Sequence, residues 1–161
     1  YKSIIPHTYV QKKAEICEAK VQNGKREGMF KRWHSNGQLR RVFQYKNGKK
    51  EGLQRQWYEN GQLKREIYYS AGIKDGVYKS WEHGTLISEI YYKAGELNGW
   101  SKGWHDNGLP YMEKYYENGK EDGTSKAWFQ NGQLREEVNY KNEKCSIFKN
   151  LAALKKFDMV I

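Results

Sequence analysis

The chain alternates apolar and polar residues along short segments, and the whole pattern repeats every 23 or 24 residues. Residues that tolerate positive φ, most often Asn-Gly, separate the segments, as hairpin turns require. A fixed period of this length means that each unit is one supersecondary element that buries its apolar side chains only against stacked neighbours. The pattern therefore predicts a row of β-hairpins. Its clearest marker is one tryptophan per unit, at Trp33, Trp57, Trp81, Trp104 and Trp128.

The register of each hairpin follows from the loop length that collects the apolar side chains. A three-residue loop at 35–37, with Gly37 left-handed, puts Trp33 opposite Leu39, whereas a two-residue loop would send them to opposite faces. The same register pairs Lys31 with Arg41 and Met29 with Phe43.

The parity of this register predicts one packed face that carries four rows of side chains. They are the Trp row, a Leu row (Leu39, Leu63, Leu86, Leu134), a mostly β-branched row (Phe43, Ile67, Ile90, Val138) and a Tyr row (Tyr45, Tyr69, Tyr92, Tyr116, Tyr140). The fourth repeat has Pro110 in the Leu row and Lys114 in the β-branched row. Because proline cannot donate to a ladder, we expect a bend or gap there.

A row of glycines stands five residues before each tryptophan. Glycine inside a strand marks a bulge or a close approach, so we expect a structural role, with a neighbouring aromatic ring over the bare backbone. The row is Gly28, Gly52, Gly76, Gly99 and Gly123.

The unit Tyr-x-Asn-Gly-x-x-x-Gly-x-x-x-x-Trp-x-x-Asn-Gly-x-Leu resembles the MORN repeat, and specifically the bacterial variant of the YwqK-like antitoxin family. The resemblance covers residues 19–142, as five repeats and a leading half. It implies an all-β fold in which tandem hairpins form a single-layer, twisted antiparallel sheet. Bacterial members are often antitoxins or immunity proteins, which implies a module that binds and neutralises a toxin.

Both ends of the chain are expected to cap the array, giving an N-terminal arm at 1–18, repeats at 19–142 and a cap at 143–161. Residues 146–157 place Ile147, Leu151 and Leu154 at helical spacing behind a Ser N-cap. We expect a short C-terminal helix over the last sheet edge, with a partner-docking helix as the alternative. Residues 4–10 are predicted to form an extended arm.

Composition supports a thin sheet and limits the chemistry. The chain of 161 residues is only 37% hydrophobic but 15% aromatic, and aromatic side chains bury large areas. Cys17 and Cys145 lie near opposite ends of the array, so we expect no intramolecular disulfide. No run of 18 apolar residues exists. We expect a cytoplasmic protein, or an envelope or periplasmic one if a signal peptide preceded Tyr1.

No catalytic pattern or cofactor motif is present in the sequence. His34 and His105 occupy one repeat position three units apart, on the order of 29 Å, and cannot share a metal. We expect the histidines to face solvent and the acidic rows to be solvated or salt-bridged. The expectation is therefore no enzyme, no metal and no cofactor.

A positive charge stands two residues before every tryptophan, and the net charge is +10. The candidate binding stripe comprises Lys31, Arg55, Lys79, Lys102, Lys126, Trp57, Trp81, Trp104, Tyr69 and Tyr92. Such a surface suits a protein partner, since Trp, Tyr and Arg dominate interface hot spots. The expected partner is a toxin with an acidic surface.

Three other interpretations remain open. The first is a polyanion, either an acidic membrane surface or nucleic acid, although the acidic rows argue against nucleic acid. The second is an envelope-associated structural scaffold. In the third, the stripe has no binding role. The aliphatic parts of the Lys and Arg side chains lie over the aromatic rings, and their charged groups contact water or the acidic rows.

Overall fold

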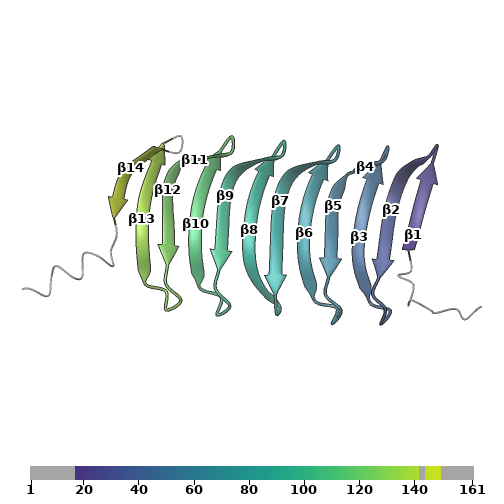
Figure 1. Ribbon diagram of the computed structural model, residues 1–161, viewed down its shortest axis with the longest axis horizontal. Helices are drawn as coiled ribbons and strands as arrows, with labels where there is room; N and C mark the ends of the chain where they lie inside the picture. Colours follow the sequence, from purple (N-terminus) through teal and green to yellow (C-terminus); the bar gives the residue numbers. More distant parts are fainter. Residues whose placement is uncertain (1–16, 142–143, 150–161) are drawn as a thin grey trace, which may run out of the picture.

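The computed structural model describes residues 17–141 and 144–149, and there every regular element is a β-strand of one sheet. The sheet is a single layer, elongated across its strands (Figure 1). The strands are β1 (Cys17–Gln22), β2 (Lys25–Trp33), β3 (Leu39–Lys46), β4 (Lys49–Lys50), β5 (Gly52–Trp57), β6 (Leu63–Ser70), β7 (Ile73–Glu82), β8 (Thr85–Lys93), β9 (Glu96–Trp104), β10 (Pro110–Glu117), β11 (Lys120–Glu121), β12 (Gly123–Trp128), β13 (Leu134–Lys141) and β14 (Lys144–Lys149).

The strands follow one another in sequence order as an antiparallel meander. The order is β1-β2-β3-β5-β6-β7-β8-β9-β10-β12-β13-β14, with β4 paired to β3 and β11 to β10. Strands β1 and β14 form the two ends of the long axis (Figure 1). The prediction of an all-β, single-layer sheet of hairpin repeats is confirmed.

The loop that follows each tryptophan is the predicted three-residue loop in four of the five hairpins. In the first, His34 N donates to Gln38 O at 2.7 Å, and Gly37 has φ 86°. The third hairpin is the exception, because His83 and Gly84 form a two-residue turn with φ 48° and 83°. This shorter turn explains the one 23-residue interval.

Each hairpin is joined to the next by a two-residue turn in which both φ angles are positive, as at Asn47 (52°) and Gly48 (80°). This is the geometry that favours Asn-Gly. Each of these turns is also bonded to a strand of the preceding repeat, since Gly48 N donates to Arg26 O and Gly72 N donates to Lys50 O.

Part of the predicted register is wrong because a bulge lies next to each tryptophan. Trp33 does pair with Leu39, but Arg32 pairs with Arg41, which leaves Arg40 as an extra residue. From that point Lys31 lies opposite Val42, so the predicted pairs Lys31–Arg41 and Met29–Phe43 are wrong. The other four hairpins shift at the same place.

The bulge divides the predicted packed face between the two sides of the sheet, since one inserted residue reverses every later side chain. We call the side with the Trp and Leu rows the tryptophan face. The opposite side, with the β-branched and Tyr rows, is the tyrosine face. The prediction that the Trp and Tyr rows share one face is therefore wrong.

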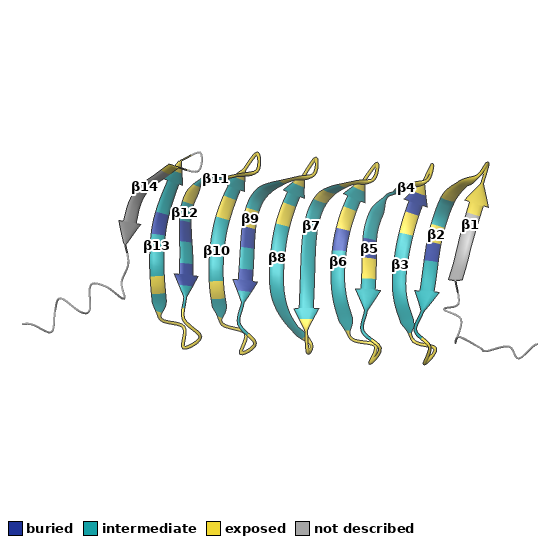
Figure 2. Cartoon of the chain, viewed as in Figure 1, coloured by how far each residue is buried: buried dark blue, intermediate teal, exposed yellow. Residues whose placement is uncertain are grey.

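The tyrosine face is the packed one, since the buried residues belong to it by their pairing. Figure 2 marks the positions of the buried residues along the strands. Phe30 and Tyr45 meet edge to face with ring centroids 6.1 Å apart, and Phe43 packs on Tyr45 in the same way. The buried side chains all lie on this face: Phe30, Tyr45, Gln54, Ile67, Ser101, Ser125, Ala127 and Val138.

Pro110 causes no special gap. It is the first residue of β10, where a proline is tolerated, and it pairs with Trp104 as Leu39 pairs with Trp33. The register shift beside it occurs in every hairpin, so the predicted local disruption is wrong. Lys114, which replaces a β-branched residue, forms an ion pair with Glu121.

The glycine row has positive φ throughout, from 67° at Gly52 to 120° at Gly76, so the backbone conformation explains these glycines. A close approach adds to it at two positions only. An added Cβ would lie 3.0 Å from Tyr68 Cβ at Gly76 and 3.2 Å from Tyr91 Cβ at Gly99. At the other three glycines nothing lies within 4 Å, so the expected overlying ring is absent there.

The two ends differ from expectation where they are described. Residues 144–149 form β14 on β13, so the predicted C-terminal helix does not begin at Ser146. Residues 150–157 and the predicted arm at 4–10 lie outside the described residues. Cys17 and Cys145 belong to the two outermost strands of the meander, as expected. The three predicted domain ranges remain predictions.

Candidate binding surfaces

The basic row of the predicted stripe lies on the tryptophan face and is matched there by a row of glutamates. Each cation contacts the glutamate opposite it in its own hairpin because the bulge brings the two rows into register. The pairs are Arg55–Glu66 at 2.6 Å, Lys79–Glu89 at 2.8 Å, Lys102–Glu113 at 3.2 Å and Lys126–Glu137 at 3.6 Å. The hydrogen bond to Glu89 raises the pKa of Lys79.

Within its own hairpin Lys31 lies opposite Val42, and on its other side it lies opposite Glu18 of β1. The expectation of a solvated or salt-bridged row is thus confirmed for these glutamates, which are Glu66, Glu89, Glu113 and Glu137. The binding role of Lys31, Arg55, Lys79, Lys102 and Lys126 remains a prediction, but four of these charges are shared with carboxylates.

Beyond the ion pairs, toward the inter-repeat turns, the tryptophan face carries a continuous apolar row. We call it the apolar strip; it consists of Leu53, Tyr68, Val77, Tyr91, Trp100 and Tyr115, on β5 to β10. Four members are largely exposed: Tyr68 45%, Trp100 41%, Tyr91 37% and Tyr115 36%. Trp100 and Tyr115 meet edge to face at 5.4 Å. Six adjacent strands span about 24 Å.

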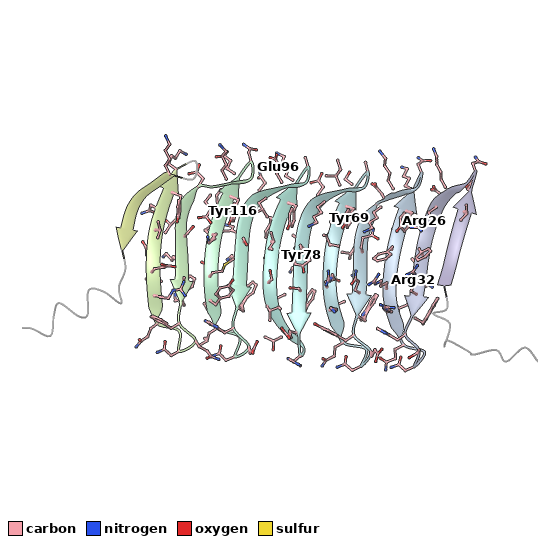
Figure 3. All side chains as sticks on the ribbon, viewed as in Figure 1. Arg26, Arg32, Tyr69, Tyr78, Glu96 and Tyr116 are labelled. Atoms are coloured by element: carbon pink, nitrogen blue, oxygen red, sulfur yellow. The ribbon has the colours of Figure 1, made fainter. Side chains whose placement is uncertain are left out.

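The structure separates the aromatic members of the predicted stripe. Trp57, Trp81 and Trp104 are half-buried at the loop ends of their strands on the tryptophan face. Tyr69 and Tyr92 lie on the other face (Figure 3 labels Tyr69), where Lys50 and Lys74 cover their rings at 4.8 and 4.6 Å. Tyr69 and Tyr92 therefore cannot join the stripe as one surface.

The histidines show a structural role that the sequence reading missed. His34 Nε2 donates to Trp57 O at 3.0 Å, and His105 Nε2 donates to Trp128 O at 3.3 Å. Tyr58 occupies the same repeat position and its hydroxyl donates to Trp81 O. The side chain of His34 is only 11% exposed, so the prediction of a solvent-facing histidine is wrong for it. His83 is exposed in its turn as expected.

A separate acidic row, formed by Glu27, Glu51, Asp75 and Asp122, also has a bonding role. Glu27 Oε2 accepts a hydrogen bond from Asn47 N, and Glu51 Oε2 accepts one from Ala71 N, one repeat further along. These carboxylates hold the turn amides of successive hairpins together. At the end of the row, the bond to Lys141 lowers the pKa of Asp122.

Gln54 is a second residue that the sequence did not single out. It is 1% exposed on the tyrosine face, beside the break between β4 and β5. Its Oε1 accepts from Gln44 N at 3.0 Å, and its Nε2 lies within bonding distance of the Glu51 and Gly52 carbonyls. A single side chain thus replaces ladder bonds that are missing at the break between β4 and β5.

Neither face shows a catalytic or metal-binding arrangement in the described ranges. There, no three His, Cys, Asp or Glu side chains gather closely enough to hold a metal ion. The cavities are shallow clefts between hairpins, such as one of about 250 Å³ beside Lys114 and Tyr140. The geometry provides two extended surfaces, the tryptophan face and the tyrosine face. The expectation that the chain is not an enzyme stays a prediction.

These features define a class: a tandem β-hairpin repeat protein with two open faces. Residues 26–47, 50–71 and 121–142 each match the MORN repeat variant family. Three of the repeats are thus similar to MORN repeats, which generally serve as binding modules. The hairpins between the matched ones depart through the short His83-Gly84 turn and Pro110, yet keep the same register.

No curated protein matches the chain. Within the described residues, none of the elements is a helix with the length and apolarity needed to cross a bilayer.

Proposed function

We propose that this chain is a non-catalytic module that binds a protein partner through the apolar strip of the tryptophan face. The observation that carries the proposal is the concentration of four exposed aromatic side chains in one continuous apolar strip over the middle of the array. Tyr and Trp supply large contact areas and dominate interface hot spots, which cluster near the centre of an interface. The middle hairpins provide that centre.

The ion-paired row beside the strip gives the interface its polar border. Paired charges at the rim orient a partner and exclude competitors more than they add affinity. The net charge of +10 favours a partner with an acidic surface.

The resemblance to the bacterial YwqK-like antitoxin family narrows the proposed partner to a toxin that this chain neutralises. A standard protein interface buries roughly 800 Å² on each partner. A strip of about 24 Å along the array, together with the strands' own length, provides a surface on that scale.

Co-expression with the protein encoded by the neighbouring gene tests this proposal. The wild-type chain should restore growth, and the variant Tyr68→Ser/Tyr91→Ser/Tyr115→Ser should not, although it should fold because these rings are exposed. The control is Tyr111→Ser/Phe129→Ser, which removes similarly exposed rings that are not members of the strip. Equal rescue by both variants would contradict the proposed surface, and no rescue by the wild type would contradict the antitoxin role.

Arg55, Lys79 and Lys102 are the expected central positive contacts. Because each contacts a glutamate, neutralising one partner leaves a lone carboxylate, so each pair must be neutralised together. A variant in which all three ion pairs are neutralised should associate with the protein partner more slowly, and its association rate should depend less on salt. An unchanged association rate would show that the row plays no part in encounter.

A further inference from the structure

The described array begins and ends with half a hairpin. Strand β1 joins β2 through a two-residue turn at 23–24 with positive φ at both positions, like the turns that join one hairpin to the next. Strand β1 is therefore a second strand that has no first strand beside it among the described residues. In β14, Lys149 lies opposite Glu137 of the preceding strand. Lys79, in the first strand of the third hairpin, lies opposite Glu66 in the same way, so β14 is a first strand without its second.

The outer edges of β1 and β14 carry backbone groups that the sheet does not pair. In the described part of the chain each of these strands has one neighbour, whereas the others in the continuous order have two. An edge strand presents a row of N–H and C=O groups that another strand can pair. On the β1 edge the apolar side chain of Val21 is 62% exposed. Both edges are thus suited to accept a further strand.

The directions of the two end strands suit a continuation of the sheet. The continuous order contains an even number of described strands, so β1 and β14 run in opposite directions at opposite ends of the long axis (Figure 1). A second copy placed end to end therefore sets its β1 antiparallel to β14 of the first copy. The antiparallel meander then continues across the junction, with the tryptophan face on the same side of both copies.

One row of residues crosses the whole described sheet and gives its two edges opposite charges. We call it the charged row; it has one residue on each strand of the continuous order, and each lies opposite the next. Acidic and basic residues alternate along it except at Val42, between β2 and β5. In strand order its members are Glu18, Lys31, Val42, Arg55, Glu66, Lys79, Glu89, Lys102, Glu113, Lys126, Glu137 and Lys149.

We propose that copies of this chain associate head to tail, with β14 of one copy pairing with β1 of the next to complete a further hairpin. Lys149 of one copy then lies opposite Glu18 of the next. Lys126 and Glu137 are paired in this way in the last complete hairpin, 3.6 Å apart. Opposite charges directly across a strand pair are stabilising, and they also fix the register. This interaction goes beyond the proposed function and does not rest on it.

The other positions of the two edges are compatible with this register. It sets Glu18–Gln22 of one copy opposite Cys145–Lys149 of the other, in antiparallel order. Ala19 then lies opposite Phe148, which combines a small residue with a large one. Val21 lies opposite Ser146, so the added strand covers its exposed side chain.

Head-to-tail pairing suits the two edges better than pairing of like edges. Two β14 strands with matched ends would bring Lys144 of each copy onto Lys149 of the other. Two paired β1 strands would leave both β14 edges open. A head-to-tail contact is heterologous, so it repeats at the free ends and builds an open row of copies. Each copy lengthens the row by about 58 Å, since its twelve described strands in continuous order lie about 4.8 Å apart.

Sedimentation velocity on the full chain tests this association. Physiological salt limits the repulsion between copies with a net charge of +10, because it screens charges over about 8 Å. The average mass should rise between about 10 µM and about 1 mM and pass beyond that of a dimer, since small interfaces bind weakly. A chain that stays monomeric over this range would overturn the proposal, because its edges would then be covered by its own residues. A mass that stops at the dimer would also overturn it, since it indicates pairing of like edges.

Charge reversal at the two ends of the charged row tests the register. Glu18→Lys and Lys149→Glu each set like charges opposite each other, so each variant alone should self-associate about tenfold more weakly than the wild type. The controls Lys46→Glu and Glu96→Lys make the same changes of charge at exposed positions away from both edges. These controls should change the association less than about twofold.

Mixing the two reversed variants separates the register from effects on folding. In an equimolar mixture of Glu18→Lys and Lys149→Glu each reversed residue faces the reversed residue of the other variant, so the mixture should associate like the wild type. Two misfolded variants would not restore each other. Single reversals that associate like the wild type, or a mixture that associates no better than its components, would contradict head-to-tail pairing.

Discussion

Replacing Gln54 by methionine should destabilise the array more than any exposed substitution in the same hairpin. The amide of Gln54 bonds to Gln44 N, Gln44 O, Glu51 O and Gly52 O at 2.8 to 3.2 Å. Gln44 O also accepts a bond from Glu51 N, so the groups that depend on Gln54 are Gln44 N and two carbonyls.

The cost follows from the groups left unpaired. Methionine conserves the volume of the side chain, so the packing contribution should be small. Leaving a buried donor unpaired costs roughly 1–3 kcal/mol, and each lost neutral bond adds about 1 kcal/mol where water cannot enter. We expect a loss of about 2–4 kcal/mol in the free energy of unfolding.

Urea denaturation followed by tryptophan fluorescence measures this loss, and Gln44→Met is the matched control. The Gln44 side chain is exposed although its backbone bonds to Gln54, so this variant should stay within about 0.5 kcal/mol of the wild type. If Gln54→Met unfolds at the same urea concentration as Gln44→Met, the amide does not replace the ladder bonds, and the reasoning is refuted.

The remaining predictions concern other rows of the array. Trp81→Ala should cost more than Trp128→Ala in thermal melts, because a central repeat supports two neighbours; loss of a packed Trp typically costs roughly 3–5 kcal/mol. Burial first, and then Glu121, raises the pKa of Tyr116 from 10.0 to about 12, so its contribution to stability is complete below pH 10 and is lost as the pH rises toward 12. Tyr116→Phe should flatten the fall in stability above pH 10; an unchanged slope would exclude this cause. Ala71→Asn and Ala94→Asn should each raise stability by about 0.5–1 kcal/mol, since both alanines have φ 50°; a lower melting temperature would contradict a backbone origin.

The turns were predictable from sequence because their chemistry is local. Positive φ at Asn47 and Gly48 is a property of those two residues, and Gly37 likewise identifies its own loop. The pairing of Trp33 with Leu39 then follows from loop length. The repeat, the sheet and the hairpin order could therefore be read from the chain.

The division into two faces was not predictable, because the bulge depends on pairing between distant residues. Five positions separate Gly28 from Trp33, but six separate Leu39 from Tyr45, and these segments pair end to end. That mismatch requires one extra residue, yet nothing local shows that Gly28 pairs with Tyr45. Phe30, a large apolar residue out of phase with Trp33, was the available sign.

The candidate site was misread for the same reason. The basic row before the tryptophans was visible in the sequence, but the glutamates that pair with it come into register only through the bulge. The sequence analysis did not single out Tyr68 and Tyr91, which precede Tyr-row residues in the chain but lie on the opposite face. The burial of Arg65 Nε without a hydrogen-bond partner among the described residues depends on the packing of the sheet, which composition does not reveal.

Hydroxyl-radical footprinting of the complex with the protein partner tests the central claim most directly. Tyr68, Tyr91, Trp100 and Tyr115 are exposed in the free chain and should become protected together on binding. Phe129, which is 40% exposed away from the apolar strip, should keep its reactivity. Protection confined to Phe129 and the loops, with the four strip residues as reactive as in the free chain, would contradict docking on the tryptophan face.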